Sequence, residues 1–302
     1  MRVAAIDCGT NSIRLLIADI EGNSFREVKR EMIIVRLGQG VDQTGKFHPD
    51  AIKRTLAAVD LYAAEIARKG VERIRFCATS ATRDAANRNL FIDGVKERLG
   101  VEPEVISGEE EATLSFLGAT RDLPRNQAPF LVVDIGGGST EFVIGTDSVE
   151  HAKSVNIGCV RMTERHFAEG YGQSARDYAI ADIDAAIAEA AEVVPITTAT
   201  TLIAVAGTAT TVAAAALDLP EYDRYSIHLA RIPAKRVHEI SEMFFALSRE
   251  ERAKLGYMHE GRVDVIAAGA LVLSRIMRAT GAQEFIASET DILDGIAWSL
   301  AR

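Results

Sequence analysis

The sequence of residues 130–145 is Phe130-Leu131-Val132-Val133-Asp134-Ile135-Gly136-Gly137-Gly138-Ser139-Thr140-Glu141-Phe142-Val143-Ile144-Gly145. An apolar run ends at an Asp, a turn rich in Gly follows, and a second apolar run comes after it. Short apolar runs bounded by Gly and Ser are typical of strands. The sequence therefore predicts two buried strands joined as a hairpin, with polar groups at its tip.

The same pattern occurs at the beginning of the chain, where the apolar runs 3–6 and 13–18 flank the turn Asp7-Cys8-Gly9-Thr10-Asn11-Ser12. The two segments align without a gap at an offset of 127 residues, which places Asp7 on Asp134 and Arg14 on Glu141. A repeat with the period of a whole domain indicates duplication of one architecture.

A polar segment with two prolines, residues 123–129, separates the repeats and is the best candidate for a linker. We therefore expect an N-terminal domain over residues 1–123 and a C-terminal domain over residues 124–302. Predicted strands alternate with predicted helices, which favours an α/β fold. The predicted helices are 49–69, 85–99, 109–117, 177–193, 211–217, 235–247, 263–278 and 291–302, and further strands are 31–36, 73–78, 101–106, 201–205 and 284–287.

Composition restricts the class of protein. The chain has 302 residues, 48% hydrophobic residues and a net charge of −9, which argues against general nucleic-acid binding. No apolar run reaches the roughly 20 residues that span a bilayer, and Asp7 interrupts any signal peptide, so we expect a cytoplasmic protein without membrane contact. The three cysteines show no CxxC spacing, which predicts buried free thiols.

The two glycine turns are typical of phosphate sites. Gly lets the backbone approach a phosphate, and exposed N–H and hydroxyl groups bind its oxygens. A carboxylate beside such a site repels phosphate unless a cation lies between them, so Asp7 and Asp134 are predicted to associate with Mg²⁺. The alternative is that each Asp only caps its hairpin. Gly207 and Thr208 form a third turn between a predicted strand and a predicted helix, where N–H groups favour anions.

Candidates for acid–base chemistry lie in Ser107-Gly108-Glu109-Glu110-Glu111-Ala112. Glu109 and Glu110 are explained by the dipole and cap of a helix N-terminus. Glu111 precedes an apolar stretch and is the candidate base that orients an attacking water. From the residues alone, the choice between Glu110 and Glu111 stays open. Arg83 and Arg14 are candidate phosphate ligands, and the six histidines are treated as structural.

These residues resemble the exopolyphosphatase / guanosine pentaphosphate phosphohydrolase (Ppx/GppA) family, a branch of the actin–hexokinase–heat-shock superfamily. The matching segments are 5–12, 78–83, 106–112, 133–141 and 206–208, in the order of the family. The resemblance implies two actin-like (ribonuclease H-like) domains with an active site in the cleft between them. It further implies Mg²⁺-dependent attack of water on a terminal phosphate.

The roles that the resemblance implies fall on particular residues. Glu111 matches the catalytic base, and Asp134 and Glu141 match the acids associated with Mg²⁺, beside Asp7 from the first turn. We expect phosphate contacts from the three turns and the two arginines: Gly9, Thr10, Asn11, Ser12, Arg14, Arg83, Gly136, Gly137, Gly138, Ser139, Gly207 and Thr208.

The chain departs from the family pattern in two places. Longer members have a helical extension, whereas this sequence ends at Arg302 and resembles the short two-domain class, which predicts a preference for short polyphosphate. Residues 288–295 also lack an Arg that many members have in a Ser-x-Gly-Leu-Arg-x-Gly pattern.

The leading prediction is an exopolyphosphatase that removes the terminal phosphate of inorganic polyphosphate. The alternatives are hydrolysis of guanosine pentaphosphate to the tetraphosphate, hydrolysis of nucleotides such as ATP, and a non-catalytic protein that binds polyphosphate or nucleotide. A sugar kinase would share the fold, but the Glu-Glu-Ala element favours activation of water. A homodimer is among the oligomeric states that the sequence leaves open.

Overall fold

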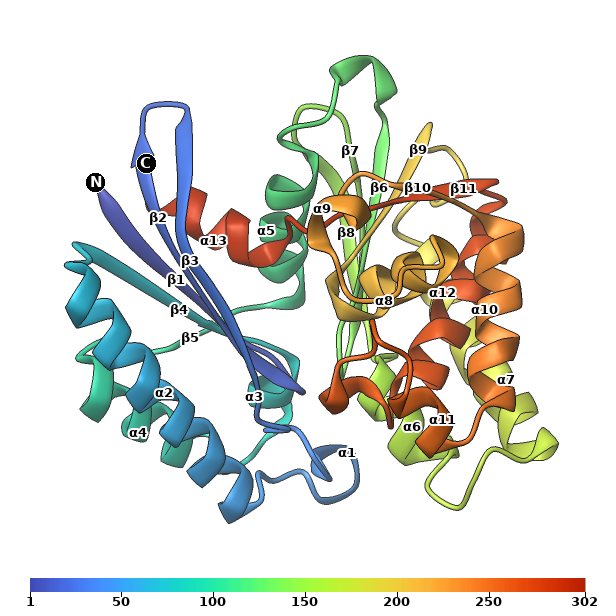
Figure 1. The fold of residues 1–302 in the computed structure, drawn as a ribbon, viewed down its shortest axis with the longest axis horizontal. Helices are drawn as coiled ribbons and strands as arrows, with labels where there is room; N and C mark the ends of the chain where they lie inside the picture. Colours follow the sequence, from blue (N-terminus) through green and yellow to red (C-terminus); the bar gives the residue numbers. More distant parts are fainter. Residues whose placement is uncertain (302) are drawn as a thin grey trace. The chain divides into compact units, whose positions relative to one another are not determined.

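The computed structural model describes residues 1–301, which form two α/β units. The first unit contains residues 1–118 and 292–301, and the second contains residues 119–291. Each unit has its own sheet and its own helices (Figure 1). Among the described residues, no helix is both long enough and apolar enough to cross a membrane.

The first unit is built on a five-stranded mixed sheet in the order β3-β2-β1-β4-β5. Strands β1 and β2 are antiparallel, and β1, β4 and β5 are parallel neighbours. Residues of β1 and β2 are apolar on both faces because both faces are covered. The strands are β1 (Arg2–Cys8), β2 (Ser12–Glu21), β3 (Ser24–Ile34), β4 (Arg73–Ala78) and β5 (Glu104–Val105).

Helices cover both faces of this sheet. In Figure 1, α2 (Pro49–Lys69) and α4 (Asn89–Leu99) lie on one side, and α5 (Gly108–Thr120) and α13 (Ile292–Ser299) lie on the other. Alternate residues of β1 enter two different apolar clusters, as the two-residue period of a strand requires. The short helices α1 (Val41–Thr44) and α3 (Ser80–Asp84) complete the unit.

The sheet of the second unit has six strands in the order β10-β11-β9-β6-β7-β8. Strands β6 and β7 are antiparallel, whereas β6, β9 and β11 are parallel neighbours. The strands are β6 (Phe130–Ile135), β7 (Thr140–Gly145), β8 (Val149–Val155), β9 (Thr201–Val205), β10 (Arg231–Pro233) and β11 (Glu284–Ala287).

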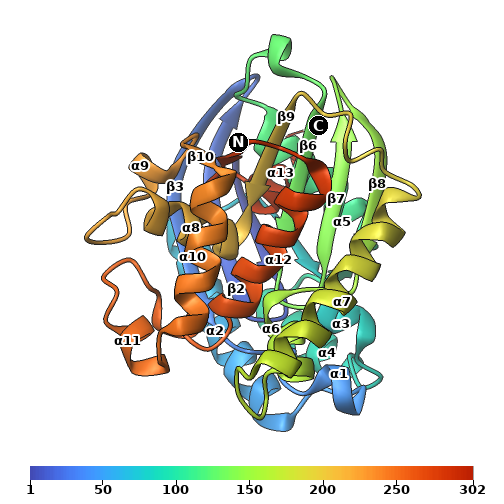
Figure 2. The same cartoon turned by 90° about the vertical axis from the view of Figure 1, so that its right-hand side faces the viewer.

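The main core of the second unit forms around α12 (Ile266–Thr280), which contacts four other helices. Figure 2 shows α12 between α10 (Ala234–Ala246) and α7 (Gln173–Ala191). Most of α12 is buried, which explains why its sequence is apolar around most of its circumference. The remaining helices are α6 (Cys159–His166), α8 (Ala206–Ala216), α9 (Arg224–Ile227), α11 (Arg249–Ala253), and the 3₁₀ turns Arg125–Gln127 and Glu260–Arg262.

The predicted duplication is confirmed by the strand orders. The order β3-β2-β1-β4-β5 in the first unit corresponds to β8-β7-β6-β9-β11 in the second, with the same parallel and antiparallel neighbours. The edge strand β10 has no counterpart in the first unit, over its described residues. The cleft that the resemblance implies between the domains stays a prediction.

The grouping of residues differs from the expected domains 1–123 and 124–302 at the end of the chain. Helix α13 belongs to the first unit, where Ile292 and Ile296 pack with Val3 of β1 in one apolar cluster. The sequence predicted a helix over residues 291–302 but could not indicate which sheet it covers. The division near residue 118 falls within α5.

Several local predictions are corrected by the structure. The helix predicted over 85–99 begins at Asn89, and residues 80–84 form a separate helix. The strand predicted over 101–106 has only two residues, since Pro103 has no N–H to donate to a sheet. Helix α8 begins at Ala206 instead of residue 211. Strand β8 and helix α6 were not predicted.

Candidate active site

The first glycine turn, residues 7–12, joins β1 to β2. Gly9 N–H donates to the Ser12 carbonyl at 3.0 Å, which closes the turn. Carbonyl groups of the turn accept hydrogen bonds from the segment after β3, at Thr10 from Gly38 N–H and at Asn11 from the N–H groups of Val35 and Arg36. In a trans peptide the C=O and the following N–H point in opposite directions. The N–H groups of Asn11 and Ser12 therefore point away from that segment.

Thr10 has a buried hydroxyl inside this turn. Its Oγ1 atom has no hydrogen-bond partner among residues 1–301, and only 6% of the residue is exposed. A buried hydroxyl without a partner costs free energy. A phosphate oxygen bound at the turn would satisfy it.

Asp7 and Arg14 are cross-strand partners at the mouth of the first turn. Arg14 Nη2 lies 2.6 Å from Asp7 Oδ2, and Arg14 Nε donates to the same oxygen at 2.9 Å. This pair of hydrogen bonds fixes the guanidinium of Arg14. It also places a positive charge beside Asp7, which disfavours a cation on that carboxylate.

Glu111 lies in the first turn of α5, where it is buried and forms an ion pair with the partly buried Arg83 of α3. Arg83 Nη1 donates to Glu111 Oε2 at 2.6 Å and to the Ile106 carbonyl at 3.1 Å. Burial raises the pKa of the Glu111 carboxyl, whereas Arg83 opposes the shift and the nearby charge of Asp7 adds to it. Thr79 also contributes a hydrogen bond to Glu111. The structure thus brings Glu111, Arg83 and Asp7, which were predicted as separate candidates, into one cluster.

Glu110 has different surroundings from Glu111. Its side chain is 46% exposed and its Oε1 atom lies 2.6 Å from Arg75 Nη2. The Ser107 hydroxyl accepts from Glu110 N–H at 3.2 Å, which is the predicted helix cap. Of the two residues, Glu111 is therefore the buried one, and burial raises the pKa of its carboxyl.

The second glycine turn, residues 134–139, joins β6 to β7 and is anchored to α6. Three carbonyl groups accept hydrogen bonds from the start of α6, at Gly136 from Cys159 N–H, at Gly137 from Val160 and Arg161 N–H, and at Gly138 from the Arg161 side chain. Because C=O and the next N–H are opposed, the N–H groups of Gly137, Gly138 and Ser139 point away from α6. Successive N–H groups directed to one side form a concavity that binds anions.

Gly158 makes this anchoring possible. A Cβ atom at Gly158 would lie 2.4 Å from the carbonyl carbon of Gly137 and 2.6 Å from the nitrogen of Gly138. No side chain fits at that distance from backbone, so α6 approaches the turn only because residue 158 is Gly. No local signal in the sequence identifies Gly158, since isolated glycines are common in loops.

Asp134 and Glu141 are cross-strand partners at the base of the second turn. Both residues are buried, and Glu141 Oε1 accepts from Ser139 Oγ at 2.8 Å and from Ser154 Oγ at 2.7 Å. Mg²⁺ usually binds one or two protein carboxylates together with water and substrate phosphate. The donor type of this pair fits such an ion. Within residues 1–301, no three Asp, Glu, His or Cys side chains form a group that could hold a metal alone.

Gly207 and Thr208 lie in the first turn of α8, after a left-handed residue, Ala206, with φ of 66°. The Arg262 guanidinium packs against Gly207, where a Cβ atom would lie 2.6 Å from Arg262 Cζ. Arg262 Nη1 donates to Thr211 Oγ1 at 3.1 Å. The contact of Arg262 with the third turn was not predicted, because no local signal in the sequence links Arg262 to residues 207 and 208.

The prediction of buried free cysteines is confirmed, whereas the structural role of the six histidines stays a prediction. All three cysteines are free and buried. Burial raises the pKa of the Cys159 thiol to about 11, so Cys159 is a neutral thiol near pH 7. Three histidines accept backbone N–H bonds: His48 from Asp50, His259 from Gly261, and His228 from Glu289.

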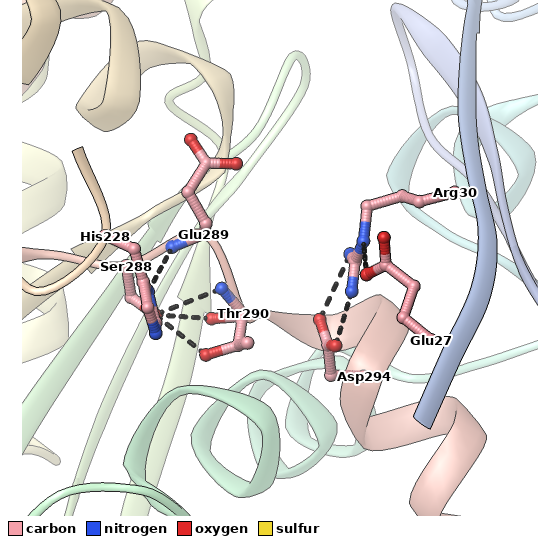
Figure 3. A network of polar contacts seen from close by, with 7 residues as sticks. All are labelled: Glu27, Arg30, His228, Ser288, Glu289, Thr290 and Asp294. Carbon is pink, nitrogen blue, oxygen red and sulfur yellow. Dashed lines mark hydrogen bonds and ion pairs between the residues drawn. The ribbon is translucent and has the colours of Figure 1, made fainter. Parts of the chain in front are cut away.

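The segment 288–295, where the sequence lacks an expected Arg, makes local contacts in each unit (Figure 3). In the second unit, Ser288 Oγ contacts Thr290 and accepts from its N–H. In the first unit, Asp294 accepts two hydrogen bonds from Arg30, at 2.5 and 3.2 Å. The Asp294 carboxylate therefore has a structural role, because its hydrogen bonds with Arg30 attach α13 to β3.

The sequence of the chain is similar to those of known proteins. Residues 16–302 match the family model of the Ppx/GppA phosphatase family. The chain is 45% identical to "Exopolyphosphatase 2" of Mycobacterium tuberculosis strain H37Rv, covering 99% of this chain and 98% of that protein. It is 37% identical to a "Guanosine-5'-triphosphate,3'-diphosphate pyrophosphatase" of Pseudoalteromonas atlantica, covering 61% of this chain and 36% of that protein.

A solved structure shows the same fold over the whole chain. The crystal structure of an exopolyphosphatase-like protein superimposes with a TM-score of 0.96 at 44% identity, covering 100% of this chain and 99% of that chain. Together with the paired strand orders, this match agrees with the predicted α/β, actin-like fold class.

Proposed function

Since the chain belongs to the Ppx/GppA phosphatase family, and is therefore a phosphoric anhydride hydrolase, we propose that it removes the terminal phosphate of inorganic polyphosphate with Glu111 as the general base. The observation that supports this most directly is the ion pair between the buried Glu111 and the partly buried Arg83. Its neighbour Glu110 is exposed and engaged by Arg75.

Glu111 would accept a proton from the attacking water. A carboxylate is an effective base at neutral pH when its pKa is raised towards the working pH, and burial shifts the pKa of Glu111 in that direction. The hydrogen bond from Arg83 holds one carboxylate oxygen in place, which restricts the orientation of the base. Arg83 also supplies positive charge where negative charge develops on the phosphoryl group.

The glycine turns would bind the phosphates. The N–H groups of Gly137, Gly138 and Ser139 supply a fixed set of donors in the second unit, and Gly136 closes that turn. In the first unit, the N–H of Gly9 closes the turn, and Thr10, Asn11, Ser12 and Arg14 would offer hydroxyl, N–H and guanidinium donors. Gly207 and Thr208 would add donors from the start of α8.

Mg²⁺ would bind at Asp134 and Glu141, where it would neutralise phosphate charge beside the second turn. Asp7 stays a predicted metal-associated residue, but its ion pair with Arg14 favours a role in orienting that guanidinium. Ser139 and Ser154 hold the Glu141 carboxylate in position through hydrogen bonds.

Short polyphosphate is the proposed substrate within this class. Residues 124–302 contain 16 basic and 24 acidic side chains, a net charge of −8, whereas residues 1–123 have 18 and 19, a net charge of −1. A long polyanion would meet repulsion beyond the donors of the turns. Three free cysteines fit a reducing compartment, and we propose the cytoplasm.

Guanosine pentaphosphate is the second candidate substrate, supported by the match to the Pseudoalteromonas atlantica relative. Phosphate release from short polyphosphate, long polyphosphate, guanosine pentaphosphate and ATP, under one condition with Mg²⁺, decides between the candidates. The proposal expects the highest kcat/KM on short polyphosphate. A higher kcat/KM on guanosine pentaphosphate would transfer the assignment to that substrate, and no release from any of the four would overturn the proposed function.

A further inference from the structure

The segment after β3 holds the first glycine turn through its backbone. Val35 and Arg36 donate to the Asn11 carbonyl at 3.0 and 2.9 Å, and Gly38 donates to the Thr10 carbonyl at 2.9 Å. Arg36 adopts a φ of 48°, a left-handed conformation that is uncommon for a residue other than Gly and persists when its surroundings enforce it. The position of this segment is thus closely coupled to that of the turn.

Gly38 makes the closest approach. A Cβ atom at Gly38 would lie 2.3 Å from Thr10 Cγ2 and 3.0 Å from Ala81 Cβ. Carbon atoms without a bond between them normally approach to about 3.5–4.0 Å. The φ of Gly38 does not lie in the left-handed region, so space, and not backbone conformation, is the reason for Gly at this position.

One neighbour of Gly38 belongs to the candidate active site, and the other lies on a helix that contributes to it. Thr10 presents the buried hydroxyl that has no partner among the described residues. Ala81 lies on α3, the short helix that also contains Arg83, the partner of Glu111. Gly38 therefore packs between the first turn and the helix of Arg83.

We propose that Gly38 is a positioning residue for the hydrolysis, an inference that rests on the proposed function. The absence of a side chain lets Thr10 Cγ2 pack directly on the backbone of residue 38, which fixes the rotamer of Thr10 and the direction of its hydroxyl. The same contact sets the spacing between the turn and α3, and hence the place of Arg83 relative to the turn.

Gly38→Ala tests the proposal, because its new methyl must displace Thr10, Ala81 or both. A displacement of about 1 Å at a reacting group costs on the order of 10²-fold in rate. We expect kcat/KM to fall by at least about 10-fold. KM should rise because the turn that would bind phosphate is displaced, and kcat should fall because Arg83 is displaced. A simple loss of folded enzyme would lower kcat and leave KM unchanged.

Thr10→Ser provides the compensating change, because it removes the Cγ2 atom that the new methyl would meet and keeps the hydroxyl. In the background of Thr10→Ser, the change Gly38→Ala should cost several-fold less in kcat/KM than in the wild-type background. Equal losses in both backgrounds, or wild-type kinetics of Gly38→Ala, would overturn the proposal. The matched control is Gly172→Ala in the second unit, where a Cβ atom meets nothing within 4 Å and wild-type kinetics are expected.

A second measurement covers the case in which Gly38→Ala does not fold. Thr10→Ser alone frees the hydroxyl from the rotamer that the methyl contact fixes, so the proposal expects a raised KM for phosphate substrate in a variant that melts cooperatively. An unchanged KM would contradict it. If the wild-type protein released no phosphate from any substrate, the proposed function would fail, while the coupling of residues 10 and 38 would still be measurable in thermal melts of the double variant.

Discussion

Glu110 and Glu111 show how neighbouring residues of the same type acquire different properties. Glu110 points to Arg75 and is half exposed, whereas Glu111 is buried beside Arg83 and has a raised pKa. One residue of a helix is rotated by about 100° from the next, which is sufficient to separate solvent from interior. These surroundings are the reason why the proposed function places the general base at Glu111 and not at Glu110.

The raised pKa of Glu111 predicts a dependence of stability on pH. The folded state binds this proton more tightly than the unfolded state, so the stability contributed by the carboxyl is present below the usual Glu pKa and is lost as the pH rises through the folded pKa. Glu111→Gln removes this titration. We expect the variant to be more stable than the wild type near neutral pH, with the difference shrinking on acidification.

Urea unfolding at several pH values measures this difference. Glu97→Gln is a suitable control, since the Glu97 side chain is 82% exposed. The stability of this variant is expected to follow that of the wild type at every pH. A stability difference between Glu111→Gln and the wild type that did not change with pH would contradict a raised pKa at this position.

The proposed binding of Mg²⁺ can be tested at Asp134. Asp134→Asn replaces the proposed charged ligand by a neutral one next to Glu141 and should raise the Mg²⁺ concentration needed for half-maximal activity. The control is Asp147→Asn, at a carboxylate whose side chain is 83% exposed. Titration of Mg²⁺ in phosphate-release assays compares the variants, and an unchanged requirement in folded Asp134→Asn would exclude the metal role.

Most residues of the candidate site could be identified from the sequence, but their contacts could not. Glu111 and Arg83 were recognised separately, because each follows a recognisable segment, yet their hydrogen bond depends on how α3 and α5 pack on one sheet. Gly158 and Arg262 act through close approach to residues distant in sequence. A single sequence contains no local signal for such contacts.

At the scale of elements, hairpins and long helices could be predicted from the sequence. The sheet or helix against which each of them packs could not. Helix α2 spans Pro49–Lys69 as predicted, since Pro49 at its start and Gly70 after its end are local signals. The sheet that α13 covers is decided by tertiary packing. Strand β8 was missed because its sequence, Val149–Val155, has few apolar residues.

The packing of α13 on α5 gives a prediction for stability. A Cβ atom at Gly295 would lie 2.0 Å from the Leu114 carbonyl oxygen, so Gly295→Ala must push α13 away from the helix that contains Glu111. We expect a loss of about 1–3 kcal/mol in the free energy of unfolding. Denaturant melts measure this loss, with Gly172→Ala as the control. Wild-type stability of Gly295→Ala would contradict the prediction, because α13 could then move away from Leu114 without a loss of stability.

At the scale of the whole molecule, charge is distributed unevenly along the chain. The net charge of −8 over residues 124–302 opposes the binding of a long polyanion. Charges separated by more than a Debye length, about 8 Å at physiological salt, are largely screened. Only the phosphates close to the turns are thus expected to contribute to affinity.

This distribution predicts distributive digestion. When a mixture of short and long polyphosphate is digested, kcat/KM should be higher on the short chains, and intermediates of many lengths should accumulate from the long ones. Gel analysis of product lengths over time measures this. Long chains that disappear without intermediates, at a higher kcat/KM than short chains, would show that the proposed length preference is wrong.

The most direct test of the account is phosphate release by two matched variants, Glu111→Gln and Glu110→Gln, each checked for wild-type cooperativity in thermal melts. Both changes remove one carboxylate charge from the same helical turn. A general base contributes on the order of 10²–10⁴ in rate, so Glu111→Gln should lower kcat by about that factor, and Glu110→Gln should stay within a few-fold of the wild type. Near-wild-type turnover by Glu111→Gln, with loss of turnover in Glu110→Gln, would contradict the account.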